Sequence, residues 1–186
     1  ASTTKLITAI AFLKQVEAGS ARFDDQLGLY PSGFQLQQLI NQSNNISWDL
    51  LNDYVGSDAR QKLARDLGLT SYNMAKNEIS PQDMARLLDK LGQGKLLNQE
   101  HTELLLAYMQ NTNEERFITS VVPDSVNAYH KTGLYNDVAH DAAIIDNGRQ
   151  PFILVIFSDG NGTQDFNTRA KTFRSVTKLA LDAFDK

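Results

Sequence analysis

The sequence predicts an α+β fold, in which a helical lobe lies beside an antiparallel sheet that is flanked by helices. Apolar residues recur at helical spacing through most of the first 120 positions, with glycines between the segments. Three strand patterns then follow one another near residues 126–131, 137–146 and 151–158. Strands joined by such short connections pair in antiparallel fashion, and a final helical segment is left to cover the sheet.

The helical segments are expected to begin at capping residues and to end at glycines. Asp58, Ser80 and Asn98 are typical starts, and Gly19 and Gly68 are typical stops. The expected helices lie near residues 4–18, 34–42, 46–55, 57–67, 81–92, 98–110, 113–119 and 165–184.

Composition limits the possible functions. The chain has 186 residues with 41% hydrophobic content, which suits one domain or most of one. The net charge is −4 and the basic residues are scattered, which argues against a nucleic-acid partner. No cysteine is present and the three histidines lack metal-ligand spacing, so we expect neither a metal nor a cofactor. His140 and Asp141 are expected to form a surface or cross-strand pair.

The first motif that bears on chemistry is S-x-x-K, formed by Ser2-Thr3-Thr4-Lys5 at the start of the first helix. Helix geometry places Ser2 and Lys5 on one face. A serine hydroxyl needs a nearby base to become a nucleophile, and a desolvated lysine can be that base. The same motif is also compatible with a serine that only caps the helix and a lysine without a catalytic role. A second S-x-x-K occurs at Ser175 to Lys178.

Two further motifs follow in the chain. Ser43-Asn44-Asn45 is an S-x-N between two helical segments, where it also fits an ordinary helix cap. The same pattern recurs at residues 71–73 and 125–127, so it has little weight alone. Lys131-Thr132-Gly133 is the chain's one K-[ST]-G, at the end of a strand pattern, and Gly133 lets another backbone approach closely. Each motif alone is weak evidence, and the prediction depends on the order in which the three occur along the chain.

In this order the motifs resemble those of the class A β-lactamase-like branch of penicillin-recognising serine enzymes. The resemblance covers nearly the whole chain, and it implies the β-lactamase/transpeptidase-like form of the α+β fold, with its site between the lobes. It implies a single catalytic domain over residues 1–186, with a helical lobe at about 20–122 and a sheet lobe at about 123–186.

The resemblance also implies roles for the motif residues. Ser2 would be the nucleophile, Lys5 its general base, and Ser43 the relay of a proton to the leaving nitrogen. Asn45 would hold the substrate's side-chain amide, and Lys131 and Thr132, beside Gly133, its carboxylate. The backbone N–H groups of Ser2 and Leu134 would form the oxyanion hole.

The chain departs from class A β-lactamases in two places. Those enzymes carry a deacylating Glu in an E-x-x-L-N pattern, whereas the one acid in residues 69–79 is Glu78, which is more simply explained as a residue that favours the helix N-terminus. The family also has strands before the nucleophile, in the same sheet as the last strands. Residues 152–157 form a continuously apolar strand that would be aggregation-prone at an open edge. We therefore expect the N-terminal strands to be missing from this sequence.

Three functions remain open. The first is a β-lactamase-like hydrolase that β-lactams acylate at Ser2 and that releases the product slowly. The second is a D-alanyl-D-alanine peptidase or penicillin-binding protein acting on peptidoglycan stem peptides. The third is a β-lactam or muropeptide binding module without turnover. Each implies an extracytoplasmic location, and the sequence leaves the oligomeric state undetermined.

Overall fold

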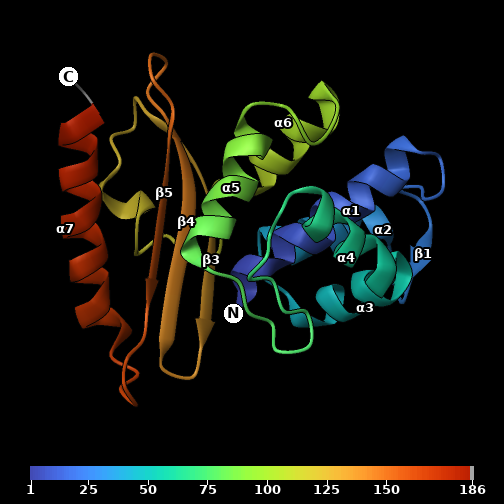
Figure 1. Ribbon diagram of the computed structural model, residues 1–186, viewed down its shortest axis with the longest axis horizontal. Helices are drawn as coiled ribbons and strands as arrows, with labels where there is room; N and C mark the ends of the chain where they lie inside the picture. Colours follow the sequence, from blue (N-terminus) through green and yellow to red (C-terminus); the bar gives the residue numbers. More distant parts are fainter. Residues whose placement is uncertain (185–186) are drawn as a thin grey trace.

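The computed structural model describes residues 1–184, which form a helical lobe beside a three-stranded sheet (Figure 1). Most of the expected helices and all three strands are present. The elements are η1 (Ser2–Thr4), α1 (Lys5–Glu17), β1 (Gln26–Leu27), β2 (Tyr30–Pro31), α2 (Ser32–Ile40), α3 (Asn45–Val55), α4 (Ser57–Asp66), α5 (Pro81–Gly92), α6 (Gln99–Tyr108), η2 (Thr119–Val121), β3 (Asn127–Tyr135), β4 (Val138–Asp146), β5 (Phe152–Ser158) and α7 (Phe166–Phe184).

The sheet has the order β3-β4-β5, and both pairings are antiparallel. Side chains alternate between its two faces, so β4 contributes to two separate cores. Ala142 and Ile144 join the larger core with the helical lobe, whereas Ala143 and Ile145 join a smaller core beneath α7. Figure 1 shows α7 on one side of the sheet and α5 with the remaining helices on the other.

Helix α1 is the centre of the helical lobe. All nine residues from Lys5 to Leu13 are buried, and α2, α3 and α4 all contact this helix. Helices α2 and α3 show the apolar stripe of surface helices, but α1 is surrounded on all sides, as its nearly unbroken apolar sequence requires. Lys5 of the S-x-x-K motif is therefore the first residue of this buried helix.

Two expectations about local structure were wrong. Residues 113–119 do not form an α-helix; the segment is a series of turns that leads into η2. There the Glu115 side chain accepts a hydrogen bond from the Thr112 backbone N–H at 2.6 Å, and such side-chain bonds compete with helix formation. Strand β3 also runs past residue 131 to Tyr135, so Lys131-Thr132-Gly133 lies inside the strand and does not end it.

Strand β5 is at the edge of the sheet. It pairs with β4 on one side, and no other strand among residues 1–184 pairs with its second side, as expected from the sequence. Its residues contribute to both cores, with Ile153 and Val155 on one face and Leu154 and Ile156 on the other. Most of them are only partly buried, because an edge strand lacks a neighbour to cover it.

None of the helices within residues 1–184 combines the length and the apolar character needed to cross a membrane.

Candidate active site

Ser2 lies against strand β3. It begins the single 3₁₀ turn η1, which continues directly into α1. A Cβ atom placed on Gly133 would lie 2.8 Å from the Ser2 backbone nitrogen and 3.0 Å from that of Thr3, closer than real side-chain atoms approach. Glycine at this position therefore allows η1 and β3 to touch, as the sequence suggested for a close backbone approach.

Lys5 joins this turn to the S-x-N motif. Its side chain is fully buried, and Nζ donates to the Ser43 carbonyl oxygen at 2.6 Å and to Asn45 Oδ1 at 2.7 Å. A longer contact of 3.4 Å reaches Ser43 Oγ. The Trp48 ring lies 5.2 Å from Nζ and adds a cation–π contact for the charged form.

The backbone of the S-x-N motif is shaped to present these oxygens. Ser43 has a φ of 53°, a left-handed conformation that is uncommon outside glycine and asparagine. Asn44 then caps α3, because its side chain accepts a hydrogen bond from the Ser47 N–H at 2.9 Å. Residues 43–45 thus cap α3 and also contribute to the candidate site, so the two roles that the sequence left open are compatible.

Lys131 approaches Ser43 from the sheet. Its Nζ donates to Ser43 Oγ at 2.9 Å and to the Thr132 carbonyl oxygen at 2.9 Å. Only 1% of Lys131 and 5% of Thr132 is exposed. Lys131 is therefore a buried side chain that reaches Ser43 from the sheet.

Burial changes the protonation of both lysines. Desolvation lowers the pKa of Lys5 to about 8, against the opposing effect of the Asp49 carboxylate. Desolvation and then repulsion from Lys5 lower the pKa of Lys131 to about 7. At neutral pH the site can therefore provide an amine as well as an ammonium group, which is the combination needed for moving a proton beside a fixed positive charge.

The structure brings most of the sequence-predicted site residues together. Hydrogen bonds link Lys5, Ser43, Asn45 and Lys131, and the contact of Gly133 places Ser2 and β3 side by side. Leu134 directly follows Gly133, so its N–H belongs to the strand segment that touches η1. No hydrogen bond joins the Ser2 hydroxyl to Lys5 or Ser43 within residues 1–184, and such contacts often tighten only when a substrate binds.

The additional motif matches lie elsewhere. Ser175 is exposed on α7, and its hydroxyl donates to the Lys171 carbonyl oxygen at 3.0 Å, an ordinary bond within a helix. Ser71 binds the Asp83 carboxylate at 2.6 Å beside the start of α5. Ser125 lies two residues before the start of β3. Spatial position therefore separates the candidate motifs from the chance ones.

A charged cluster beside Lys131 was not predicted from the sequence. His130 Nδ1 lies 3.0 Å from Asp141 Oδ1, and His130 Nε2 lies 3.1 Å from Glu115 Oε1. The expected pairing of Asp141 with His140 was wrong, since adjacent strand residues point to opposite faces. Asp141 is fully buried beside His130, while His140 stacks on Phe157 with ring centroids 4.1 Å apart. The position of His130 directly before the K-T-G motif was the one available signal.

Glu78 lies close to η1. It pairs with Asn73 in an isolated β-bridge, and it lines a small cavity together with Ala1 and Thr3, the two neighbours of Ser2. Ser80, and not Glu78, caps α5, because its hydroxyl accepts from the Asp83 N–H at 3.2 Å. The expectation that Glu78 favours the helix start through its charge stays a prediction.

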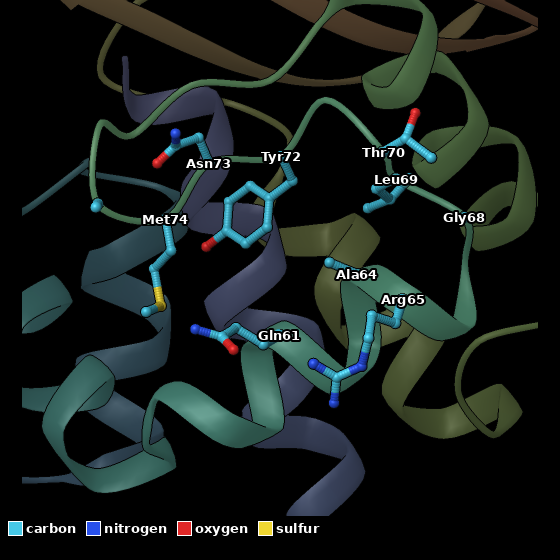
Figure 2. A pocket seen from close by; sticks show the side chains of 10 residues that line it. Gln61, Ala64, Arg65, Gly68, Leu69, Thr70, Tyr72, Asn73 and Met74 are labelled. Carbon is cyan, nitrogen blue, oxygen red and sulfur yellow. The ribbon is translucent and has the colours of Figure 1, made fainter.

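A larger cavity of about 600 Å³ lies between α4 and the segment that follows it (Figure 2). Its lining includes Gln61 and Arg65 from α4 and Tyr72 and Met74 from the segment. None of the residues from the three candidate motifs, at positions 2–5, 43–45 and 131–133, lines it. The sticks in Figure 2 show Tyr72 pointing toward α4 across this space.

Comparison with known proteins identifies the family. A family model described as the beta-lactamase enzyme family matches residues 1–184. The chain belongs to this family. No curated protein matches the chain.

Solved structures of related enzymes share the fold of this family member. The structure of PBP-A superposes with a TM-score of 0.87 at 22% identity, and the match covers 100% of this chain and 80% of PBP-A. A beta-lactamase from Sphaerobacter thermophilus gives 0.87 at 23% identity, covering 98% and 81% of the two chains. An ancestral class A β-lactamase of Gram-negative bacteria gives 0.85 at 22% identity, covering 99% and 85%. The predicted β-lactamase/transpeptidase-like α+β fold is thereby confirmed.

Proposed function

We propose that this serine hydrolase of the β-lactamase family is acylated at Ser2 by β-lactams and releases the acyl group slowly. The observation that carries the proposal is the buried link between two lysines through Ser43, with Lys5 at 2.6 Å from the Ser43 carbonyl oxygen and Lys131 at 2.9 Å from Ser43 Oγ. A mutant of PBP-A, solved as an acyl-enzyme complex with penicillin G, has the same fold.

The hydrogen bonds of Lys5 support its role as the general base. A neutral amine has two hydrogens and one lone pair. The Ser43 carbonyl oxygen and Asn45 Oδ1 accept those two hydrogens, which leaves the lone pair to accept the proton of the Ser2 hydroxyl. Ser2 Oγ would then attack the lactam carbonyl, and the backbone N–H groups of Ser2 and Leu134 would stabilise the oxyanion.

Ser43 and the sheet lysine would complete acylation. The Ser43 hydroxyl would donate its proton to the leaving lactam nitrogen and be reprotonated from the lysine pair. Lys131 would stabilise the substrate carboxylate from behind Ser43, and the Thr132 hydroxyl would contact that carboxylate directly. Asn45 is exposed and would hold the side-chain amide of the substrate.

Slow release follows from the segment between α4 and α5. Hydrolysis of the acyl-enzyme needs a water molecule and a positioned base. This segment has no E-x-x-L-N pattern, and its one acid is Glu78. Lys5 could serve as base in both steps, but a dedicated site for the water would be absent. We therefore expect a long-lived ester on Ser2.

The second candidate is a D-alanyl-D-alanine peptidase acting on peptidoglycan stem peptides. It uses the same acylation residues, and the lack of an E-x-x-L-N pattern favours it. A binding module that acylates without turnover is the third. In each case the protein would work outside the cytoplasm, as a secreted, periplasmic or cell-surface protein, where β-lactams and peptidoglycan are found.

Intact-mass spectrometry after mixing the chain with penicillin G tests the proposal. We expect an adduct of the penicillin mass that persists for minutes or longer and that is absent in Ser2→Ala. Rapid turnover of a chromogenic β-lactam without an adduct would contradict slow release, and Glu78→Gln would then identify the missing base. An unmodified wild-type chain would overturn acylation itself. Hydrolysis of a diacyl-D-Ala-D-Ala peptide would favour the peptidase.

A further inference from the structure

The triad Glu115–His130–Asp141, in which Glu115 is partly exposed, joins three parts of the chain. His130 on β3 and Asp141 on β4 are both fully buried and lie diagonally across the strand pair on one face. Glu115 comes from the segment between α6 and η2, where it also accepts from the Thr112 hydroxyl at 2.8 Å. Asp141 Oδ2 accepts from the Ile118 N–H at 3.0 Å, so each carboxylate binds both the imidazole and the backbone or side chains of that segment.

The same segment holds the backbone that leads into Ser43. The Asn113 N–H donates to the Asn41 carbonyl oxygen at 3.1 Å, and Asn113 Nδ2 donates to the Gln42 carbonyl oxygen at 2.9 Å. Ser43 follows at once, in its left-handed conformation. Asn113 is therefore the link between the triad's segment and the residue that both site lysines bind.

A second connection runs through the strand. His130 precedes Lys131 directly, and Lys131 Nζ donates to Ser43 Oγ at 2.9 Å. The contacts thus close a ring, from Ser43 through residues 41–42 and Asn113 to Glu115, then through His130 to Lys131 and back to Ser43. A ring of this kind fixes both partners of the Ser43–Lys131 hydrogen bond relative to one another.

A positive charge on His130 between the two carboxylates helps to keep this ring of contacts rigid. Burial lowers the pKa of His130, but the charges and hydrogen bonds of Asp141 and Glu115 outweigh that effect and raise the pKa to about 9. The pKa of Glu115 falls to about 2, because its bonds to His130 and Thr112 outweigh its own desolvation. An imidazolium with both N–H groups donating to carboxylates has one allowed ring orientation, so the link does not rotate.

We propose that Glu115, His130 and Asp141 act as positioning residues, which hold Ser43 and Lys131 at the separation that acylation needs. This inference rests on the proposed function, since it assigns these residues to acyl transfer at Ser2. They touch no reacting atom. Their effect on the reaction passes through Lys131 on one side and through Asn113 and the backbone of residues 41–42 on the other.

The test compares Glu115→Gln with a matched control, Glu17→Gln. Glu17 Oε1 lies 3.0 Å from His101 Nδ1, so the chain contains a second, largely buried His–Glu pair that has no contact with the site. Both variants keep side-chain volume and remove one carboxylate from a histidine. Asn113→Ala is the second test variant, because it removes the side-chain bond to the Gln42 carbonyl oxygen and leaves the triad and the backbone bond to Asn41 in place.

Two readouts are measured on the full chain. The first is the acylation rate with a chromogenic β-lactam, resolved into the binding constant and the rate constant of ester formation. The second is the titration of Lys131 by NMR of lysine methylene carbons, which needs no substrate. We expect Glu115→Gln and Asn113→Ala to lower the rate constant on the order of tenfold to a hundredfold with little change in binding, and to shift the Lys131 titration.

Glu17→Gln should stay within about twofold of wild type in the rate constant, even where it lowers the melting temperature. Equal losses in Glu115→Gln and Glu17→Gln would reduce the triad to general stability and overturn the proposal. An unmoved Lys131 titration in both test variants would overturn it too. If wild type is not acylated at all, the proposed function fails, while the Lys131 titration still reports whether the triad positions that lysine.

Discussion

At the scale of single residues, the two site lysines are distinguished by what they donate to. Lys5 donates to the Ser43 carbonyl oxygen and to Asn45 Oδ1. Lys131 donates to Ser43 Oγ and to the Thr132 carbonyl oxygen. Both are buried and each donates to two acceptors, and the lower pKa, about 7, belongs to Lys131. The base role is proposed for Lys5 because it lies next to the turn that begins with Ser2, whereas Lys131 comes from the sheet.

The first prediction concerns the pH dependence of acylation. The pKa of Lys5 is lowered to about 8, so its neutral, basic form grows as pH rises through that value. We expect the rate constant of ester formation to rise with pH up to an apparent pKa of about 8, measured by stopped flow with a saturating chromogenic β-lactam. Because Lys131 titrates near 7 beside it, the apparent value belongs to the pair.

Lys5→Gln provides the control for this profile. The variant should lose most of the rate and all of the rise, since general-base catalysis contributes roughly a hundredfold to ten-thousandfold. A flat profile in wild type would show that no group with such a pKa limits acylation.

The second prediction concerns Lys131 and the substrate carboxylate. Lys131→Ala should weaken acylation by carboxylate-bearing β-lactams by about tenfold or more, because the charge behind Ser43 is lost. The fold should survive, as judged by circular dichroism. Lys178→Ala, in the exposed chance motif on α7, is the matched control and should leave the rate unchanged. An unchanged rate in Lys131→Ala would remove this lysine from the site.

At the scale of elements, the contact between η1 and β3 explains why the strand carries a glycine. The third prediction is that Gly133→Ala lowers the acylation rate by about tenfold or more, because its Cβ would lie 2.8 Å from the Ser2 nitrogen and would push the turn away. The rate is compared with that of Gly94→Ala, where a Cβ would meet nothing within 4 Å.

The Gly94 control separates crowding from stability. Gly94 has a φ of 64°, so alanine there is strained and should cost stability by about 1 kcal/mol without touching the site. Equal rates in the two variants would mean that η1 tolerates the extra atom and that the close approach has no bearing on the nucleophile.

Elements with a strong local pattern could be predicted from the sequence. Helix α5 begins at Pro81 after the Ser80 cap, and β4 ends at Asp146, both as expected. Residues 113–119 could not be predicted, because the Glu115 side chain competes for backbone bonds that only the folded segment offers to it. The extension of β3 to Tyr135 likewise depends on pairing with β4, down to Tyr135 with Val138.

At the scale of the whole molecule, the candidate site depends on contacts between distant parts of the chain. Ser43 and Lys131 are 88 residues apart, and Ser2 lies beside Gly133. Periodicity cannot indicate such contacts, so the motif residues were predictable only because their order resembled a known family. The triad resembles no motif. His130, Asp141 and Glu115 show no spacing that would have marked them, and only the fold brings them together.

The last prediction is that the triad makes folding stability depend on pH with a definite sign. The pKa of His130 rises from 6.5 to about 9, so its contribution is complete below pH 6.5 and is lost as pH increases to 9. The lysines oppose this trend. Their pKa values are lowered to about 7 and about 8, so the cost of burying their charges declines as pH rises from there toward 10.5.

Comparing wild type with His130→Asn isolates the histidine from the two lysines, which both proteins share. Urea unfolding between pH 6 and 9.5 should show the stability advantage of wild type at its largest below pH 6.5. That advantage should shrink by roughly 3 kcal/mol by pH 9, the free energy that corresponds to such a change in pKa. A constant difference across the range would mean that His130 keeps the same charge in the folded and unfolded chain, and that the triad holds the strand and its segment by shape alone.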